Sequence, residues 1–221
     1  VFKGQTLGPG EQVRFTRRFG ELEHHVFSHW SLADQPEVLI VSNVQKNGEP
    51  IGVYNAGRYW HTDLSYMSAP SRGSLLYAIE VPHDGTRALG DTYFASSGAA
   101  FDSLGDDTNA QVRHLRATFS LAHQRQKLMD EGDQGAKLTQ EQLAATPVAS
   151  HSIVQRHPVT GRELLYINEG HTIEILDLPG DEGVALLSQL CAHITQPQHV
   201  YQHQWEVGDA VMWDNVATQH L

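Results

Sequence analysis

The chain has 221 residues, a formal net charge of −11 with histidine neutral, and 40% hydrophobic against 19% charged residues. This composition is typical of a globular protein and excludes a disordered chain. The acidic balance, with lysine and arginine scattered, argues against nucleic acid and the membrane surface as partners. No apolar run approaches the roughly 18 residues of a membrane span. We therefore expect a single domain over residues 1–221.

The first predicted element is a helix over residues 9–19, with Pro9 near its start and Gly20 just after its end. Most other elements are short stretches rich in β-branched or aromatic residues, which is typical of strands. These predicted strands cover residues 37–42, 74–81, 117–121, 150–155, 164–168, 200–205 and 210–213. Further helices are predicted over residues 97–104, 108–115, 139–145 and 181–194.

Strands outnumber helices and do not alternate regularly with them, which disfavours a doubly wound sheet. The predicted fold class is mainly β with flanking helices, and the first choice within it is a double-stranded β-helix (jelly roll, cupin-like). Residues 124–149 carry few large apolar side chains. This stretch is predicted to be a surface excursion, either a solvated loop or a lid over a site.

Cys191 is the only cysteine, so no internal disulfide can form and a reducing, cytoplasmic setting is expected. It falls in a helical apolar pattern over residues 184–194 and is predicted to be a core thiol rather than a nucleophile. The sequence starts at Val1 without a methionine and stops at Leu221. We expect that sequence is missing at both ends of a longer chain.

The chain contains 14 histidines, and one of them forms a His-x-Asp pair, His61 and Asp63. Chance alone would supply about one or two pairs of a histidine with an acidic residue at this spacing. On an extended segment, however, residues i and i+2 point the same way, so His61 and Asp63 can face one metal ion. A third ligand from a distant strand would complete a facial triad, which leaves positions open on iron(II). The residues alone leave that third ligand open among the other histidines.

Four segments, together with the N-terminal stretch, resemble the taurine dioxygenase family of iron(II)- and 2-oxoglutarate-dependent oxygenases in order and spacing. The resemblance covers nearly the whole chain apart from residues 124–149. The matching segments are FKGQTLGPGEQVRFTRRFGELEHH (2–25), HTDLSY (61–66), LGDTYFAS (89–96), HPVTGRELLYINEG (157–170) and WDNVATQH (213–220).

The resemblance implies that His61, Asp63 and His220 bind iron. It also implies that Thr92 binds a carboxylate of 2-oxoglutarate. With a one-residue gap, His25 aligns with a histidine that contacts the sulfonate in taurine-specific relatives, so His25 is a candidate substrate contact. The family's arginine that pairs with the far carboxylate of 2-oxoglutarate is expected beyond the last residue of this sequence.

The chain departs from the family pattern at three positions. Val216 stands where the family usually has an arginine, and Leu89 replaces the first glycine of a GGDT motif. Neither change removes a predicted metal ligand. Gly57 stands where taurine-specific members have an asparagine, which argues against assuming taurine as the substrate.

The implied activity is hydroxylation of an aliphatic carbon, with iron(II) as cofactor and 2-oxoglutarate and dioxygen as co-substrates. Succinate and carbon dioxide are released. The expected substrate is a small, anionic molecule: a sulfonate, sulfate, aryloxyalkanoate or amino-acid-like acid. Asp63 argues against halogenation, because halogenating relatives need a small residue at that position. Relatives also imply a homo-oligomer. Two alternatives remain: a zinc-dependent hydrolase that uses the same ligands, and a non-catalytic jelly-roll binding protein.

Overall fold

The computed structural model describes residues 1–178 and 180–221. The chain divides into two compact units. Unit 1 comprises Val1–Arg58, Leu75–Gly90 and Gln204–Met212. Unit 2 comprises Tyr59–Ser74, Asp91–His203 and Trp213–Leu221. No helix among the described residues is long and apolar enough to span a membrane.

Unit 1 contains one α-helix and several short antiparallel strand pairs. The helix α1 starts at Pro9, and the carboxylate of Glu11 accepts a hydrogen bond from the backbone N–H of Gly8 (2.9 Å), which satisfies a donor at the helix start. The elements of this unit are α1 (Pro9–Thr16), η1 (Ser28–Trp30), the pair β1 (Ser31–Leu32) and β2 (Gln35–Leu39), the pair β3 (Gln45–Lys46) and β4 (Glu49–Pro50), and the pair β6 (His83–Asp84) and β7 (Arg87–Ala88). The strands β5 (Gly73–Tyr77) and β15 (Ala210–Asp214) pair with each other, and only Leu75–Tyr77 and Ala210–Met212 of them belong to unit 1.

Unit 2 contains two three-stranded antiparallel sheets and a hairpin. In the first sheet, β8 (Thr92–Ser96) lies between β14 (Val200–His203) and β16 (Thr218–His220). In the second, β9 (Arg116–Phe119) lies between β10 (Ala149–Ser152) and β13 (Thr172–Ile175). The hairpin joins β11 (Val154–Arg156) to β12 (Glu163–Leu165).

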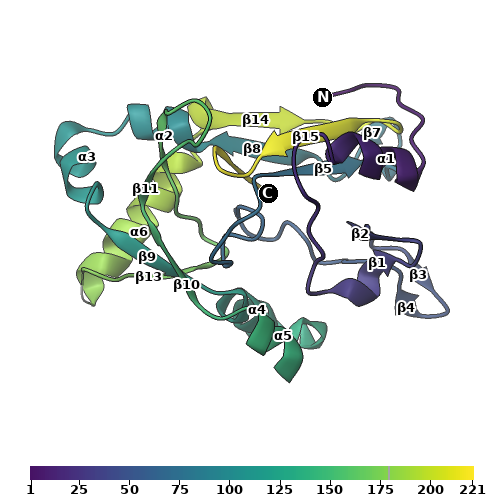
Figure 1. Cartoon of the computed structure of the whole chain (residues 1–221), viewed down its shortest axis with the longest axis horizontal. Coiled ribbons are helices and arrows are strands. Elements are labelled where there is room, and N and C mark those ends of the chain that lie inside the picture. The colour runs from purple at the N-terminus through teal and green to yellow at the C-terminus, as the bar shows by residue number, and fades with distance from the viewer. Residues whose placement is uncertain (179) are drawn as a thin grey trace. The chain divides into compact units, whose positions relative to one another are not determined.

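The helices of unit 2 are α2 (Ser97–Asp102), α3 (Asp106–Val112), α4 (Leu121–Asp130), η2 (Gln134–Ala136), α5 (Gln140–Ala145), α6 (Asp181–Ile194) and η3 (Pro197–His199). The longest, α6, packs against β13 and α2 (Figure 1). It buries Leu186, Leu190 and Ile194, which lie four residues apart on one face. Acidic side chains in its first turn complement the helix dipole. The prediction of a helix over residues 181–194 is confirmed.

The structure places part of helix α4 and the whole of helix α5 in residues 124–149, the stretch predicted to be a surface excursion. Helix α4 begins at Leu121, where the Ser120 hydroxyl accepts a hydrogen bond from the N–H of His123 (3.2 Å). Leu128 in this helix is completely buried, and Leu138 is also part of the core. This part of the chain therefore contributes to the core of unit 2 although its composition is polar.

Cys191 lies in α6 and is half-buried. Burial raises the pKa of its thiol to about 12. The thiol is therefore protonated at neutral pH, in agreement with a packing role rather than a nucleophilic one.

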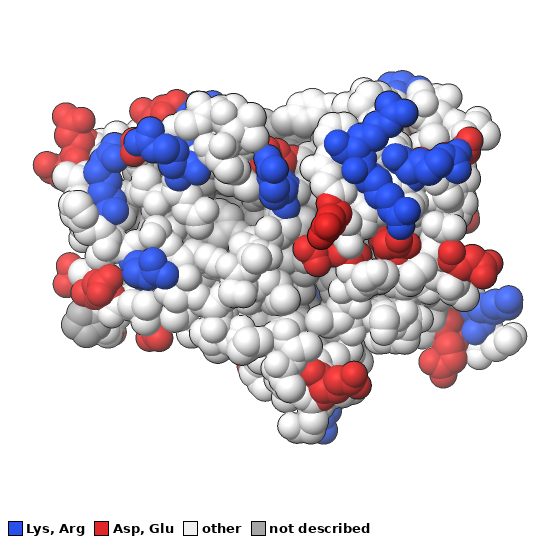
Figure 2. Space-filling view, in the orientation of Figure 1, with Lys and Arg blue, Asp and Glu red and all other residues white. Residues whose placement is uncertain are grey.

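On the face shown in Figure 2, basic and acidic side chains are interspersed.

Candidate metal centre

The two halves of the candidate site are joined by a backbone bridge between distant residues. The N–H of His61 donates to the carbonyl of His220 (3.1 Å), and the N–H of His220 donates to the carbonyl of His61 (2.9 Å). Because paired residues in an antiparallel bridge project to the same side, the two imidazoles lie next to each other, with ring centroids 4.2 Å apart. The bridge thus brings together the two histidines named from the sequence.

The His-x-Asp segment was considered as an extended segment, and in the structure its pairing is limited to a single bridge. His61 forms an isolated bridge, and the chain turns from Asp63 onward. Leu64 has a φ of 54°, in the left-handed region that residues other than glycine rarely adopt. Strained backbone of this kind is common at functional sites. The turn thus begins at Asp63, two residues after the bridge residue His61.

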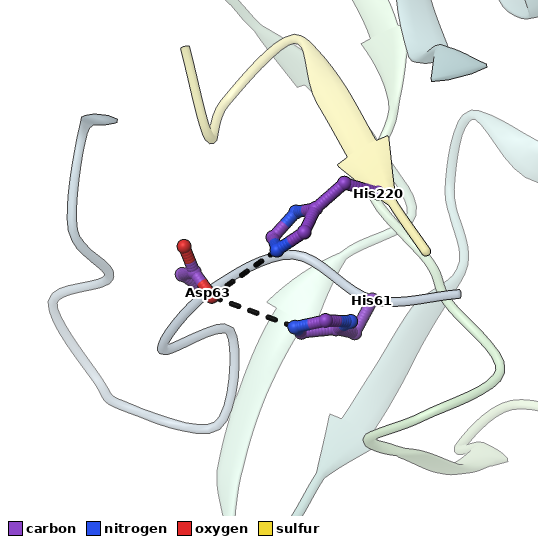
Figure 3. Close-up of side chains that lie close together, drawn as sticks. All are labelled: His61, Asp63 and His220. Atoms are coloured by element: carbon purple, nitrogen blue, oxygen red, sulfur yellow. Dashed lines mark ion pairs between the residues drawn. The ribbon is translucent and has the colours of Figure 1, made fainter. Parts of the chain in front are cut away.

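The three side chains converge on one point (Figure 3). One carboxylate oxygen of Asp63, Oδ1, lies 3.5 Å from Nε2 of His61 and 3.6 Å from Nε2 of His220. One ligand atom from each of the three residues lies within 4.8 Å of the others. Two imidazoles and one carboxylate form the donor set of a non-haem iron(II) centre. Among the described residues no other group of three or more such side chains has this geometry.

The hydrogen bonds at His61 leave the correct nitrogen available for a metal. Nδ1 of His61 lies 2.9 Å from the carbonyl oxygen of Tyr59. Because a carbonyl only accepts, Nδ1 carries a proton, and Nε2 is the nitrogen left to bind a metal when the ring is neutral. Metal-binding histidines usually donate their second N–H in this way, which fixes the ring. Nδ1 of His220 is buried and has no hydrogen-bond partner among the described residues.

The ionisation states of Asp63 and His220 favour the binding of a cation. Burial would raise the pKa of Asp63, but the neighbouring His220 and His61 and a hydrogen bond from Ser74 hold it well below its usual value. Burial, reinforced by His61, lowers the pKa of His220 to about 4. Burial also lowers the pKa of His61, but the hydrogen bond and charge of Asp63 outweigh it and raise that pKa. Asp63 is thus ionised and His220 neutral at neutral pH, the forms that bind metals.

A buried network behind His61 was not anticipated from the sequence. The imidazole of His171 packs edge-on against His61, with ring centroids 5.8 Å apart. Its Nδ1 lies 3.0 Å from the hydroxyl of Ser65, which also accepts a hydrogen bond from the side-chain amide of Asn168 (3.1 Å). Burial, with a contribution from His61, lowers the pKa of His171 to about 3, so this ring is neutral. No sequence signal separates His171 from the other histidines of the chain.

Thr92 and His25 occupy different parts of the chain. Thr92 is the first residue of β8, whose partner β16 carries His220 opposite Phe94. Because side chains alternate along a strand, Thr92, Phe94 and His220 lie on the same face of this sheet. His25 belongs to unit 1, where its Nδ1 accepts a hydrogen bond from the N–H of Phe27 (3.1 Å). Thr92 therefore belongs to the same unit as His61, Asp63 and His220, whereas His25 belongs to unit 1.

Comparison with known proteins identifies the family. The family described as taurine catabolism dioxygenase TauD, TfdA matches residues 1–221. The chain is 36% identical to an alpha-ketoglutarate-dependent 2,4-dichlorophenoxyacetate dioxygenase of Burkholderia sp. (strain RASC), over 100% of this chain and 74% of that protein. It is 34% identical to pentalenolactone F synthase of Streptomyces arenae, over 100% and 75% of the two chains.

A solved structure, that of AAD-2 in complex with Mn(II) and N-oxalylglycine, superimposes with a TM-score of 0.78. It is 32% identical in sequence, and the match covers 99% of this chain and 76% of that one. The matches support a dioxygenase and give no support to a zinc-dependent hydrolase or a non-catalytic binding protein. The chain therefore belongs to the TauD, TfdA family and is a dioxygenase that depends on iron(II) and 2-oxoglutarate.

Proposed function

We propose that His61, Asp63 and His220 are the iron ligands of this dioxygenase. The observation that carries the proposal is the convergence of both Nε2 atoms on Oδ1 of Asp63, at 3.5 and 3.6 Å. The proton on Nδ1 of His61 and the ionised state of Asp63 also suit a divalent cation. Bound there with 2-oxoglutarate and dioxygen, iron(II) supplies the oxidising power for hydroxylation of an aliphatic carbon, with release of succinate and carbon dioxide.

The protein's own contribution is to hold these ligands rigidly. The backbone bridge between His61 and His220 keeps the two imidazoles together. The carbonyl of Tyr59 orients the His61 ring, and the packing of His171 limits its movement. A site held in this way needs little rearrangement when the metal and co-substrate bind. We further propose that the antiparallel strands of unit 2, which carry this site, belong to a double-stranded β-helix.

We propose that Thr92 binds a carboxylate of 2-oxoglutarate through its hydroxyl. Its position on the same face of the sheet as His220 supports this role. Replacing Thr92 by valine keeps the shape of the side chain but removes the hydroxyl. A hydrogen bond to a charged group is worth about 1.5–3 kcal/mol, so the KM for 2-oxoglutarate should rise by about 10-fold or more. The value of kcat should change less.

The check is steady-state succinate formation as a function of 2-oxoglutarate concentration. Thr92→Ser retains a hydroxyl and serves as the matched control, which should restore most of the affinity. A Thr92→Val protein with the wild-type KM for 2-oxoglutarate would rule out this role of Thr92.

We propose that the substrate is a small organic anion and that His25 contacts its anionic group. The support is the similarity to a dioxygenase that acts on 2,4-dichlorophenoxyacetate, together with the resemblance at His25. The chain is also similar to pentalenolactone F synthase, so the class of substrate has to be tested by experiment.

A panel of aryloxyalkanoates, alkyl sulfates, sulfonates and amino-acid-like acids should be scored by substrate-dependent succinate release. We expect activity with at least one of these acids and none with their uncharged esters; turnover of the esters alone would contradict an anionic substrate.

We also propose that the protein acts in the cytoplasm as a homo-oligomer of one domain per chain. A single cysteine, Cys191, is compatible with a reducing compartment. The resemblance to the family supports self-association.

We propose that residues 124–149, besides contributing Leu128 to the core, form a lid over the substrate.

A further inference from the structure

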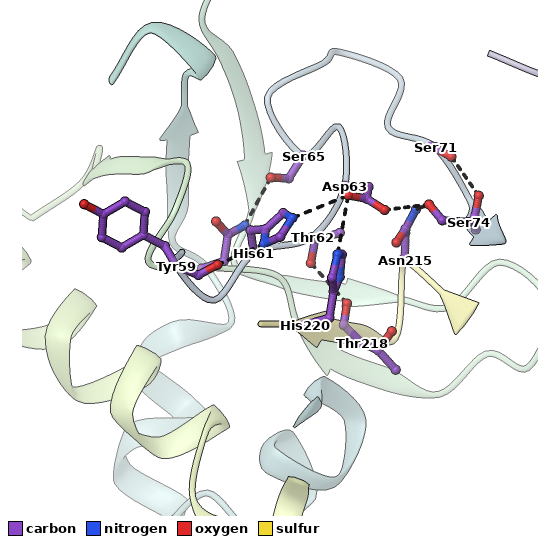
Figure 4. A network of polar contacts seen from close by, with 12 residues as sticks. Tyr59, His61, Thr62, Asp63, Ser65, Ser71, Ser74, Asn215, Thr218 and His220 are labelled. Carbon is purple, nitrogen blue, oxygen red and sulfur yellow. Dashed lines mark hydrogen bonds and ion pairs between the residues drawn. The ribbon is translucent and has the colours of Figure 1, made fainter. Parts of the chain in front are cut away.

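The two carboxylate oxygens of Asp63 have different surroundings (Figure 4). Oδ1 faces Nε2 of His61 and Nε2 of His220. Oδ2 is turned away from this point and accepts a short hydrogen bond from the hydroxyl of Ser74, at 2.6 Å. One oxygen is therefore directed to the metal position, while the other is engaged by the protein.

The hydrogen bonds behind Asp63 form a chain with one possible direction. An ionised carboxylate only accepts hydrogen bonds, so the single proton of the Ser74 hydroxyl must point at Oδ2. The oxygen of Ser74 is then an acceptor for the side-chain amide of Asn215, whose Nδ2 lies 3.0 Å away. Asn215 therefore donates to Ser74, and Ser74 donates to Asp63. The chemistry of these groups thus fixes the orientation of the amide as well as that of the hydroxyl.

Asn215, the first donor of this series of hydrogen bonds, is fixed in the protein core. Asn215 is completely buried, and its backbone N–H donates to the carbonyl of Arg72 (3.0 Å). Next to Ser74, a Cβ added to Gly73 would lie 2.8 Å from the carbonyl oxygen of Trp213, so the two backbone segments are in close contact. Neither Ser74 nor Asn215 can move far without disturbing this contact. The hydrogen bond to Oδ2 is therefore preorganised.

A carboxylate can bind a metal through one oxygen or through both. Two histidines and a single carboxylate oxygen leave the open positions that a co-substrate and dioxygen need, whereas a second oxygen of Asp63 would compete for one of them. On the basis of the proposed iron site, we propose that Ser74, held by Asn215, is a positioning residue that restricts Asp63 to binding the metal through Oδ1 alone. Its role is to keep coordination positions open for 2-oxoglutarate.

The test is the affinity of the full protein for 2-oxoglutarate at saturating Mn(II), measured by anaerobic titration calorimetry. Saturation with Mn(II) removes any effect of Ser74 on metal affinity itself. In Ser74→Ala, the dissociation constant of 2-oxoglutarate should rise by about 10-fold, as expected when a group behind a metal ligand is lost. Ser74→Thr keeps the hydroxyl and should therefore bind 2-oxoglutarate much as the wild-type protein does.

Ser71→Ala is the matched control. Ser71 lies three residues before Ser74, just ahead of β5, and its hydroxyl donates to the carbonyl of Gly73 (3.1 Å) instead of Asp63. This variant should bind 2-oxoglutarate as the wild-type protein does. Asn215→Asp replaces the donor to Ser74 by an acceptor, which draws the Ser74 proton away from Asp63, and it should reproduce the defect of Ser74→Ala. If Ser74→Ala does not fold, Ser74→Cys, with a weaker donor of similar size, takes its place.

Unchanged affinity for 2-oxoglutarate in Ser74→Ala at saturating Mn(II) would overturn this inference and leave the iron site intact. An equal defect in Ser71→Ala would also overturn it, because the effect would then come from the segment before β5 rather than from the hydrogen bond to Asp63. A wild-type protein that binds neither Mn(II) nor 2-oxoglutarate would overturn the proposed iron site together with the inference. The two failures are thus distinguishable.

Discussion

Replacement of Asp63 by alanine is expected to abolish oxygenase turnover. The carboxylate is the single anionic group of the triad, and its Oδ1 lies between the two histidine Nε2 atoms. Loss of groups that merely orient a metal ligand costs about 10–100-fold, so loss of the ligand itself should reduce kcat/KM by at least about 100-fold. The measurement is succinate release in the presence of an accepted substrate, iron(II) and 2-oxoglutarate.

Asp130→Ala is the control for this variant, because Asp130 is an exposed acid of unit 2 that accepts a hydrogen bond from Gln126. It should have the activity of the wild-type protein. Circular dichroism should show that Asp63→Ala remains folded, since the backbone bridge between His61 and His220 does not depend on the carboxylate. An Asp63→Ala protein with more than a tenth of the wild-type kcat/KM would show that Asp63 is not a ligand.

A substitution in the core of unit 2 is expected to lower the stability of the protein considerably. Leu128→Ala should destabilise the protein by about 2–5 kcal/mol, because Leu128 is completely buried and its truncation leaves a cavity. For a chain of this size, that loss corresponds to a fall of roughly 5–15 °C in the melting temperature. The measurement is thermal unfolding followed by circular dichroism.

Leu143→Ala provides a comparison within the same segment, since Leu143 in α5 is 38% exposed. This substitution should change the free energy of unfolding by about 0.5 kcal/mol or less. If both substitutions have the same small effect, residues 124–149 are a solvated excursion after all and the packing of α4 is not part of the core.

The candidate metal-binding group could be proposed from the sequence because the chemistry of its side chains is visible there. His61 and Asp63 are two residues apart, and the resemblance to a family identified His220 at a distance that spacing alone cannot address. The structure adds the reason these residues meet, which is the reciprocal backbone pairing of His61 with His220. Such pairing depends on tertiary structure and leaves no local pattern.

The elements missed from the sequence have weak local signals. Strand β16 has three residues, all with polar side chains, and owes its conformation to pairing with β8. Helix α4 has mostly polar residues, and its burial of Leu121, Arg125 and Leu128 becomes evident only after folding. In contrast, α6 was predicted with the correct bounds, because its apolar residues recur with the helical period.

The groups that support the metal ligands could not be predicted at all. Ser74 and Asn215 lie 141 positions apart, and His171 lies 106 positions from Ser65. Serine, asparagine and histidine occur throughout the chain in unrelated roles. Their importance comes from hydrogen bonds between distant segments, which composition and periodicity do not encode.

The most direct test of the account is anaerobic addition of iron(II) and 2-oxoglutarate to the purified full-length protein, followed by visible absorption spectroscopy. The account predicts a weak charge-transfer band in the wild-type protein when both are present, and its absence when either is left out. It predicts no band in Asp63→Ala and a normal band in Asp130→Ala. The absence of a band in the wild-type protein, or an undiminished band in Asp63→Ala, would contradict the assignment of the metal centre to His61, Asp63 and His220.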